Sequence, residues 1–488
     1  MQADYLAALV DHQGWPEMTI DEIAEVNPRV DKVAIPDDLS VSFVPMAAVG
    51  AGDGSIRVEE TRPAGEVKKG FTAFLEGDVL FAKITPCMEN GKMAVVPKLV
   101  NGYGFGSTEF HVLRPKPGID AKYLYYYISS QAFRREAERY MTGAVGQQRV
   151  PTTYLKECKV PIAPLDQQKC IVAEIEKQFS RLDEAVANLK RVKANLKRYK
   201  AAVLKAAVEG RLVETEAELA RREGRSFETG EQLLHRILET RRNQWKGKGK
   251  YKEPVMPDTT DLTELPEGWV SATIDAVCEQ IVDCPHSTPR FQTRDFPCID
   301  TTWMTTDGLI IEHARYVDSA TYQERIARLE PKPGDIVFAR EGTIGTAVLV
   351  PQGMKPCLGQ RVMLLRSSGL FLNELLRHVL HSETVKSQYR AQALGSTVPH
   401  INVGDVKAFK VPLPPLAEQY RIVTEVDRRF SLVREVEAQV DTNLQRAERI
   451  RQSILSKAFC QTPLEYAASC AAWLPRHNHS DVAIKRGS

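Results

Sequence analysis

The chain has 488 residues, of which 43% are hydrophobic and 26% charged, and its formal net charge of +2 is too small to identify a nucleic-acid partner. This length predicts two or more globular domains. Because there is neither a long apolar run nor a basic-then-apolar leader, we expect a cytoplasmic protein without a membrane partner. Nine cysteines at irregular spacings favour reduced thiols over a disulfide framework.

The first element in the chain is a tryptophan followed by a short strand and a capped helix. Residues 14–26 (GWPEMTIDEIAEV) carry this pattern, and residues 266–277 (PEGWVSATIDAV) repeat it. Thr19 and Thr273 have the position and residue type of a helix N-cap. We expect both tryptophans to lie in the core rather than to bind a ligand.

A β-rich body follows, because residues 40–115 contain short apolar runs broken by Gly, Asp and Pro. Residues 77–83 of this body (GDVLFAK) match residues 334–340 (GDIVFAR), and in both copies the Gly-Asp turn feeds a strand that delivers a basic residue to the next loop. Helices are predicted next over 121–140 and 370–393. Glycine-containing loops then occupy 143–149 and 395–400.

A proline-stiffened segment then leads into a long helix, and the chain contains this arrangement twice. Residues 159–172 (KVPIAPLDQQKCIV) and 410–423 (KVPLPPLAEQYRIV) lie 251 residues apart, and each leads into some forty residues without Pro or Gly. Proline sits before such a helix because it cannot continue one. The same order of elements in both halves predicts an internal duplication.

Both long helices carry an apolar residue every seven positions. The predicted seam consists of Ile175, Leu182, Leu189, Leu196 and Val203 in the first helix and Val426, Val433, Val440, Ala447 and Ile454 in the second. A strict heptad is typical of a coiled coil, and forty residues would span roughly 60 Å. The alternative is two amphipathic helices buried separately in their own domains.

The fold class predicted is therefore α+β: two globular mixed α/β domains, related by duplication and joined by two long helices that form an antiparallel coiled coil. The predicted boundaries are 1–165 and 266–416 for the globular domains, 166–265 for the first long helix with a basic linker, 417–462 for the second long helix, and 463–488 for a peripheral tail. Within the linker, residues 232–245 are predicted to be helical.

No catalytic or metal-binding pattern is found. The glycine cluster at 50–54 has neither the strand–loop–helix setting nor the Gly-Lys-Ser/Thr of a nucleotide loop. Asn27-Pro28 lacks the following aromatic that would stack a flipped base. Cys278, Cys284, His286 and Cys298 do not have the spacing of a zinc site. We therefore expect no metal and no catalytic centre in this chain.

Local charge points to DNA, with a solvated helix flank or an acidic protein partner as alternatives. Residues 189–208 contain seven Lys or Arg and no acid, which would neutralise phosphates without reading sequence. Sequence reading needs basic, amide and hydroxyl side chains directed into a groove. The loops supply these types, and the candidates are Lys83, Thr85, Asn90, Lys92, Gln147, Gln148, Arg149, Arg340, Thr343, Arg361, Ser396, Thr397 and His400.

These features together resemble the specificity (S) subunits of Type I restriction–modification systems. The resemblance covers about residues 15–460 and is carried by residues 160–168 and 411–419, the two Gly-Asp strands and the LPEGW stretch at 265–269. It implies two target-recognition domains that each read half of an asymmetric bipartite site on double-stranded DNA. The paired helices would set the spacer and dock two methyltransferase (M) subunits.

The resemblance also implies that two restriction/motor (R) subunits join for cleavage of unmodified DNA. S-adenosylmethionine, ATP and Mg would then be used by the partners in adenine methylation and cleavage, and this chain would bind none of them. Two rival hypotheses are a two-domain coiled-coil scaffold that does not read DNA and an enzyme with its own active site. The scaffold predicts no salt-sensitive DNA affinity, and the enzyme predicts binding of S-adenosylmethionine by the chain alone.

Overall fold

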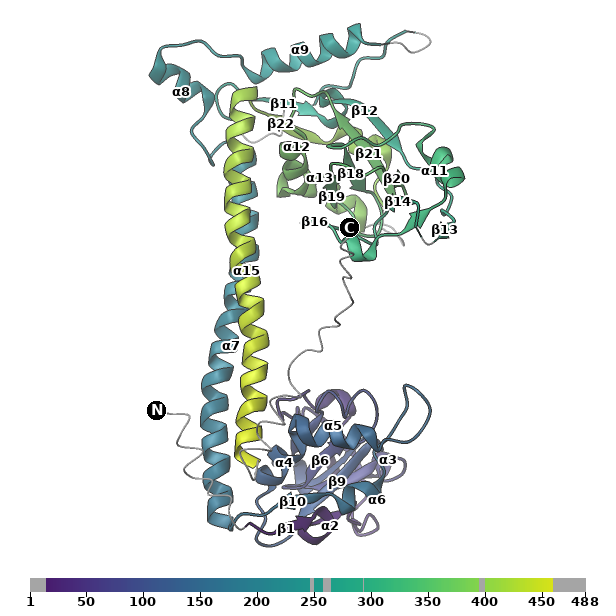
Figure 1. Ribbon diagram of the computed structural model, residues 1–488, viewed down its shortest axis with the longest axis vertical. Coiled ribbons are helices and arrows are strands. Elements are labelled where there is room, and N and C mark those ends of the chain that lie inside the picture. The colour runs from purple at the N-terminus through teal and green to yellow at the C-terminus, as the bar shows by residue number, and fades with distance from the viewer. Residues whose placement is uncertain (1–14, 246–249, 258–264, 293, 395–399, 460–488) are drawn as a thin grey trace, which may run out of the picture. The chain divides into compact units, whose positions relative to one another are not determined.

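The computed structural model describes residues 15–245, 250–257, 265–292, 294–394 and 400–459. The chain divides into two compact units, and the boundaries fall inside the two long helices (Figure 1). The first unit combines the chain up to Lys190 with the residues from Asp441 onward, and the second is Arg191–Val440. Each unit therefore takes one part of each long helix.

The first unit contains a two-stranded sheet and two four-stranded sheets. The two-stranded sheet pairs β1 (Glu17–Thr19) with β10 (Lys159–Pro161), antiparallel. One larger sheet has the order β2 (Ala24–Val26), β9 (Phe110–Pro115), β6 (Val79–Ala82), β7 (Met93–Val95); the other has the order β4 (Glu60–Pro63), β3 (Ser40–Val44), β8 (Tyr103–Gly106), β5 (Thr72–Leu75). The short helices are α2 (Ile20–Ile23), α3 (Ala64–Val67), α4 (Ala121–Ser129), α5 (Gln131–Arg139) and α6 (Thr152–Glu157), with 3-10 turns η1 (Met46–Ala48) and η2 (Val100–Gly102). The predicted β-rich body is confirmed.

The second unit repeats this plan. Its sheet β12 (Cys278–Asp283), β21 (Val362–Ser367), β18 (Ile336–Ala339), β19 (Ala347–Leu349) has the strand order of β2-β9-β6-β7, and β11 (Val270–Thr273) pairs with β22 (Lys410–Leu413) as β1 does with β10. The remaining strands are β13 (Phe291–Gln292), β17 (Tyr316–Val317), β14 (Phe296–Ile299) and β20 (Cys357–Leu358) in one sheet, and β15 (Met304–Thr305) with β16 (Gly308–Leu309) in another. The short helices are α8 (Glu216–Glu223), α9 (Gly230–Asn243), α10 (Ile274–Val277), α11 (Ser319–Ile326), α12 (Asn373–His381), α13 (Glu383–Leu394) and α14 (Val403–Ala408), with the 3-10 turn η3 (Ile311–His313). The internal duplication predicted from the sequence is thus a duplication of topology.

The tryptophan elements have the predicted local structure. Thr19 and Thr273 are the N-cap residues of α2 and α10, and each of these helices has only four residues. Trp269 is buried in the core of the second unit, and Trp15 packs partly buried against the core of the first.

The prediction of one continuous helix over 121–140, and of another over 370–393, is wrong. A serine interrupts each of them, with Ser130 between α4 and α5 and Ser382 between α12 and α13, both in extended backbone conformation. The Ser130 hydroxyl accepts a hydrogen bond from the Phe133 amide (3.3 Å), and the Ser382 hydroxyl donates to the Val379 carbonyl (2.6 Å). Serine competes for backbone hydrogen bonds in this way, which favours helix ends over helix interiors.

The two Gly-Asp turns each bury an aspartate in an ion pair. Asp78 accepts from the Leu75 amide (2.7 Å) and from two nitrogens of Arg114 (both 2.8 Å). Asp335 does the same with the Lys332 amide (2.7 Å) and Arg366. The aspartate therefore closes the turn and joins it to the neighbouring strand, β9 or β21.

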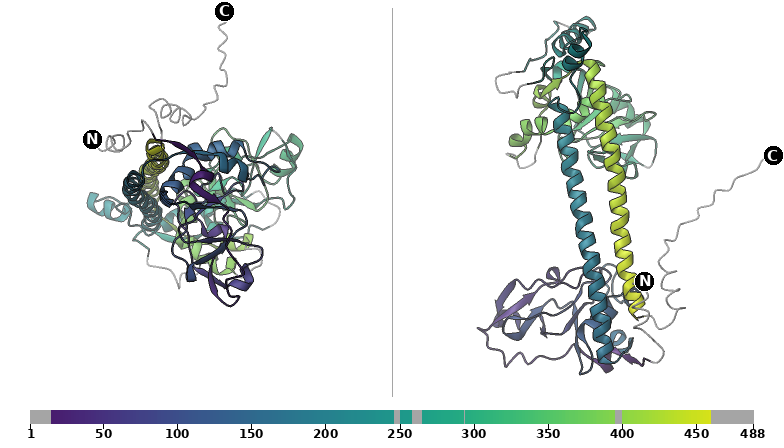
Figure 2. Two further views of the ribbon diagram at one scale, coloured as in Figure 1. Left: turned by 90° about the horizontal axis from the view of Figure 1, so that it is seen from below. Right: turned by 90° about the vertical axis from the view of Figure 1, so that its left-hand side faces the viewer.

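The two long helices are α7 (Leu165–Val208) and α15 (Leu416–Phe459), each of 44 residues. In the first unit the start of α7 packs with the end of α15, and Ile175 and Ile454 share one core. In the second unit the end of α7 packs with the start of α15, and Val203 and Val426 share the other core. The helices are therefore antiparallel, as predicted (Figure 2).

The ten predicted seam residues all lie on faces that are at least partly covered. Leu182, Leu189 and Leu196 are half-buried; Ile175, Val203, Val426, Val433, Val440, Ala447 and Ile454 are buried. Ion pairs flank the seam: Arg451 with Asp183 in the first unit, and Lys200 with Glu437 (2.9 Å) in the second.

A buried glutamine at the start of each long helix fixes it to its own globular domain. Gln168 accepts from the amide of Asp120, the N-cap of α4 (2.9 Å), and donates to the carbonyls of Gly118 (3.2 Å) and Ala163 (2.8 Å). Gln419 repeats the arrangement with Leu372, the N-cap of α12, and with the carbonyls of Leu370 and Pro414. This explains why a glutamine follows the proline-rich segment in both copies.

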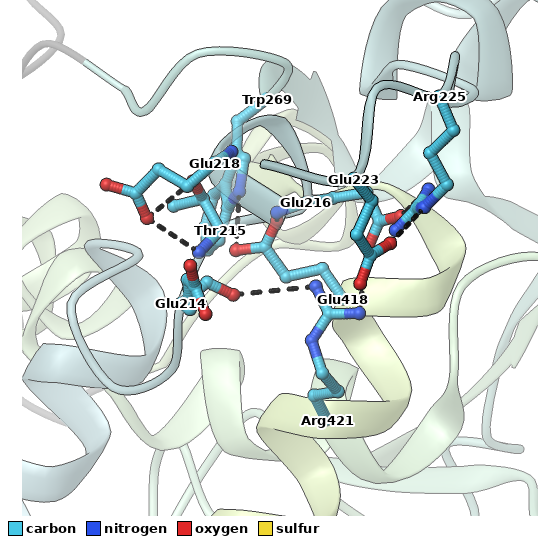
Figure 3. Close-up of polar contacts among 9 residues, drawn as sticks. All are labelled: Glu214, Thr215, Glu216, Glu218, Glu223, Arg225, Trp269, Glu418 and Arg421. Atoms are coloured by element: carbon cyan, nitrogen blue, oxygen red, sulfur yellow. Dashed lines mark hydrogen bonds and ion pairs between the residues drawn. The ribbon is translucent and has the colours of Figure 1, made fainter. Parts of the chain in front are cut away.

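The linker after α7 docks on the first turn of α15 through buried carboxylates (Figure 3). Glu418 accepts from the Trp269 indole (3.0 Å) and from the amide of Glu216 (2.9 Å), and its burial raises its pKa. Glu216 forms ion pairs with Arg421 (2.7 Å) and Arg225 (2.6 Å). Although burial opposes ionisation of Glu216, the hydrogen bonds from these arginines lower its pKa.

Within the linker, α9 confirms the helix predicted near 232–245, while α8 was not predicted. Its capping box, in which the amide of Thr215 donates to Glu218 (3.0 Å) and the amide of Glu218 to the Thr215 hydroxyl (3.2 Å), is a helix-start signal visible in the sequence.

Stability of the second unit should depend on pH through His381. The Ala347 amide donates to Nε2 of His381 (2.9 Å), and burial lowers the pKa of this buried ring to about 3. Because an unfolded histidine has a pKa of about 6.5, the unfolded state binds more protons below that pH, and stability is lost as the pH falls from there towards 3. Between pH 7.5 and 5.5 this residue should remove about 1.4 kcal/mol of unfolding free energy. Urea titrations at both pH values should show that His381→Gln loses less unfolding free energy between them than the unaltered protein does, by that amount. Equal losses in the two proteins would contradict the role assigned to His381.

Candidate nucleic-acid interface

In the first unit, the two loops that the sequence nominates for DNA contact lie together. The Thr85 amide donates to the Gln148 carbonyl (2.9 Å), and the Val150 amide donates to the Lys83 carbonyl (2.9 Å). Arg149 forms a bridge with Ile84 and a bidentate pair with Glu109 (2.9 and 2.8 Å), which lowers the pKa of Glu109. The loops after β6 and before α6 therefore form one surface.

The other candidate residues in this unit differ in how far their side chains are available to contact DNA. Lys92 donates to the Met46 carbonyl (3.0 Å) and is half-buried, so it supports the loop. Asn90 and Gln147 are exposed. The Thr85 hydroxyl lies 3.9 Å from the Met141 sulfur. Lys83 and Gln148 are half-buried, as Lys92 is.

The second unit gathers its candidates in the equivalent place. The Ile401 amide donates to the Arg340 carbonyl (3.0 Å), as Val150 does to Lys83, and His400 forms a bridge with Glu341. Arg361 has a left-handed φ of 68°. Its Nε lies 3.5 Å from Oε2 of Glu341. Thr343 is exposed, whereas Ser396 and Thr397 lie outside the described residues.

Arg340 has a structural role that the sequence did not indicate. It is 6% exposed, and its guanidinium donates to Asp283 (2.7 Å) and to the Ile401 carbonyl (3.0 Å). A guanidinium buried and paired in this way holds the loop to β12. The Arg340 guanidinium is therefore directed into the protein and not at DNA. The partner Asp283 is 57 residues away in the chain, so local sequence gave no sign of it.

A neutral histidine at this surface was missed by sequence reasoning. Burial lowers the pKa of His111, and its Nε2 lies 2.9 Å from the Val150 carbonyl. Nε2 is therefore the protonated nitrogen, and Nδ1 accepts from the Asn27 amide group at 3.1 Å. Asn27 itself has a left-handed φ of 56° and was noted in the sequence only because Asn27-Pro28 fails a methyltransferase motif.

The basic run on α7 is partly used within the protein. Lys200 pairs with Glu437 (2.9 Å) and Asp307 (3.3 Å), whereas Lys190, Arg191, Lys197, Arg198 and Lys205 are exposed. Within the described ranges, no group of three or more His, Cys, Asp or Glu residues is placed to hold a metal ion. None of the helices in that part of the chain is long and apolar enough to cross a bilayer.

The chain is similar to known proteins over most of its length. Residues 12–198 and 266–442 match the family model of the Type I restriction modification DNA specificity domain. The chain is 26% identical to the Type I restriction enzyme EcoAI specificity subunit of Escherichia coli, over 85% of this chain and 77% of that protein. It is 24% identical to the EcoEI specificity subunit of the same species, over 88% of this chain and 80% of that protein.

A solved structure of a type I R-M system contains a chain with the same fold. The two superpose with a TM-score of 0.62 at 20% identity, over 92% of this chain and 98% of the other. At that identity the likeness concerns the fold alone.

Proposed function

The chain belongs to the Type I restriction–modification DNA specificity family, and we propose that each of its two recognition domains reads one half of an asymmetric bipartite DNA site. The observation that carries this proposal is the pair of equivalent loop surfaces, in which Lys83 with Val150 and Arg340 with Ile401 occupy the same backbone positions. A shared backbone that presents different side chains suits two different half-sites.

In the same proposal the coiled coil sets the unread spacer and docks two methyltransferase subunits, with two motor-nuclease subunits joining for cleavage. The chain itself is non-catalytic. S-adenosylmethionine, ATP and Mg act in the partners, where adenine is methylated and unmodified DNA is cut. Exposed apolar side chains along the long helices, such as Val192, Leu432 and Val436, support protein docking there.

The deciding experiment is a genome-wide map of methylated adenine in the source organism, with this gene intact and with it deleted. Loss of one bipartite motif on deletion would establish the function and supply the recognition sequence. An unchanged map in a strain that expresses the methyltransferase partner would reject it.

The spacer should follow the length of the helices. Adding one heptad to α7 and one to α15, both at the unit boundary near Lys190 and Asp441, keeps the seam in register and adds about 10 Å. We expect the methylated motif to keep both half-sites and to gain about three base pairs of spacer, since the rise is about 3.4 Å per base pair. A heptad in α7 alone serves as the control and should abolish modification. Altered half-sites with an unchanged spacer would contradict this assignment.

A further inference from the structure

A pocket of about 410 Å³ opens in the first unit where β2 and β6 end. Its walls include Asn27, Arg29, Lys32, Lys83, Thr108 and Thr152, and we refer to it as the Arg29–Lys83 pocket. Lys83 also belongs to the loop surface described above, so the pocket is continuous with the candidate interface.

The charge of this pocket has one sign. Three cationic side chains and three threonines, but no carboxylate, are among its lining residues. Lys32 is committed to the protein, because its Nζ donates to the carbonyls of Lys68 (3.0 Å) and Phe71 (2.9 Å). Within the described part of the chain, Arg29 and Lys83 have no ion-pair partner. Glu109, whose pKa is also affected by the charge of Lys83, has both carboxylate oxygens bonded to Arg149.

The floor of the pocket adds no compensating charge. His111 is neutral, with Nε2 donating to the Val150 carbonyl and Nδ1 accepting from Asn27. The side-chain oxygen of Asn27, Oδ1, already accepts a hydrogen bond from the Val112 amide (3.0 Å). The polar groups left for a ligand are therefore cations and hydroxyls, which together suit an oxyanion.

The second unit differs at the corresponding position. Lys83 follows β6 and Arg340 follows β18, and their carbonyls accept from Val150 and Ile401 in the same way. Arg340, however, is buried and paired with Asp283 (2.7 Å), so its charge is neutralised inside the protein. One half of the duplication thus has an unpaired cation where the other half has an ion pair.

We propose that the Arg29–Lys83 pocket binds a backbone phosphate of the DNA on the first half-site, and that the second unit has no such contact at Arg340. This inference rests on the proposed function, because it assumes that the loop surface faces DNA. A phosphate is favoured over a base because the cations line a concavity, whereas bases are read by side chains that project into a groove. Such a contact fixes the position of the domain on the duplex without reading sequence.

The test is the salt dependence of DNA binding by the full chain, assembled with its methyltransferase partner, on a duplex that carries the mapped motif. Each phosphate contact contributes about 0.9 to the slope of log affinity against log salt. Because Arg29 and Lys83 would hold the same phosphate, the double variant Arg29→Gln/Lys83→Gln should lower that slope by about 0.9, and the preference for the motif over a scrambled duplex should not change. The charge-matched control is Lys69→Gln/Lys98→Gln, in which both lysines are exposed. By the β6–β7 register, Lys98 lies at the opposite end of β6 from Lys83.

The outcomes of this test distinguish a phosphate contact from a base contact and from failure of the proposed function. A slope that falls only in the pocket variant, and returns in Arg29→Lys/Lys83→Arg, supports the proposal. An unchanged slope overturns the proposal, and so does an equal fall in the control variant. Relaxed reading of the first half-site at constant slope also overturns it, because Arg29 and Lys83 would then be base contacts. Failure of the unaltered complex to prefer any bipartite motif would instead reject the proposed function. Circular dichroism of each variant checks that it is folded.

Discussion

Replacing Asp78 by alanine is expected to lower the unfolding free energy of the first unit by about 3–5 kcal/mol. The Asp78 side chain is 2% exposed and holds Arg114, whose pKa rises because of this hydrogen bond. Without the carboxylate, a partly buried guanidinium and the Leu75 amide both lose their partner. Removal of one member of a buried ion pair is costly because the remaining charge stays out of water.

Hydrogen exchange followed by mass spectrometry resolves the two units and is the measurement to use. Protection of β6 and β9 should fall in Asp78→Ala, while β18 and β21 keep theirs. Asp335→Ala should instead lower the protection of β18 and β21 and leave β6 and β9 unchanged, since its ion pair with Arg366 is also largely buried. The control is Glu76→Ala, an exposed residue two positions before Asp78. A loss within about 1 kcal/mol of that control would show that the pair is not needed for stability.

The second large effect is expected at the glutamines that begin the long helices. Gln168→Leu keeps a side chain of similar size but removes three hydrogen bonds. The Asp120 amide and the carbonyls of Gly118 and Ala163 then lose this partner. Each net loss is worth about 1 kcal/mol, and more where the group stays buried, so we expect at least about 3 kcal/mol.

The neighbouring residue provides a matched control. Gln167 is exposed, and Gln167→Leu makes the same chemical change without touching the buried network. Exchange at the first turn of α4 should accelerate in Gln168→Leu and stay unchanged in Gln167→Leu. Gln419→Leu should act in the same way on α12. Equal exchange in both first-unit variants would mean that the glutamine does not hold the recognition domain to α7.

The duplication, the order of elements and the heptad seam could be predicted because each is a local pattern that occurs twice. Ile175 and Val426, for example, sit at the same place in two helices, and a seven-residue repeat needs no knowledge of tertiary contacts. The breaks at Ser130 and Ser382 were missed because one serine costs a helix little. The backbone conformation of these residues is decided by the packing of the flanking helices.

The candidate site was predicted less completely, and the reason is the same in each case. Lys83 and Arg340 are alike in sequence, yet only Arg340 meets an aspartate from a distant strand. Arg29 and His111 were not among the candidates because neither lies in a glycine-containing loop. Strand pairing brings them to Lys83, and no spacing in the sequence expresses that.

The packing of α15 has a consequence for synthesis of the protein on the ribosome. Ile454, Leu455, Ala458 and Phe459 complete the core of the first unit, and the Phe459 ring lies 5.2 Å from that of Tyr123. At about 5–20 residues per second, the ribosome needs tens of seconds to travel from the first recognition domain to this helix. During that interval Tyr123 and Phe179 remain uncovered on a nascent chain. We therefore expect this unit to depend on chaperones, or on an early partner subunit, until translation reaches its last helix.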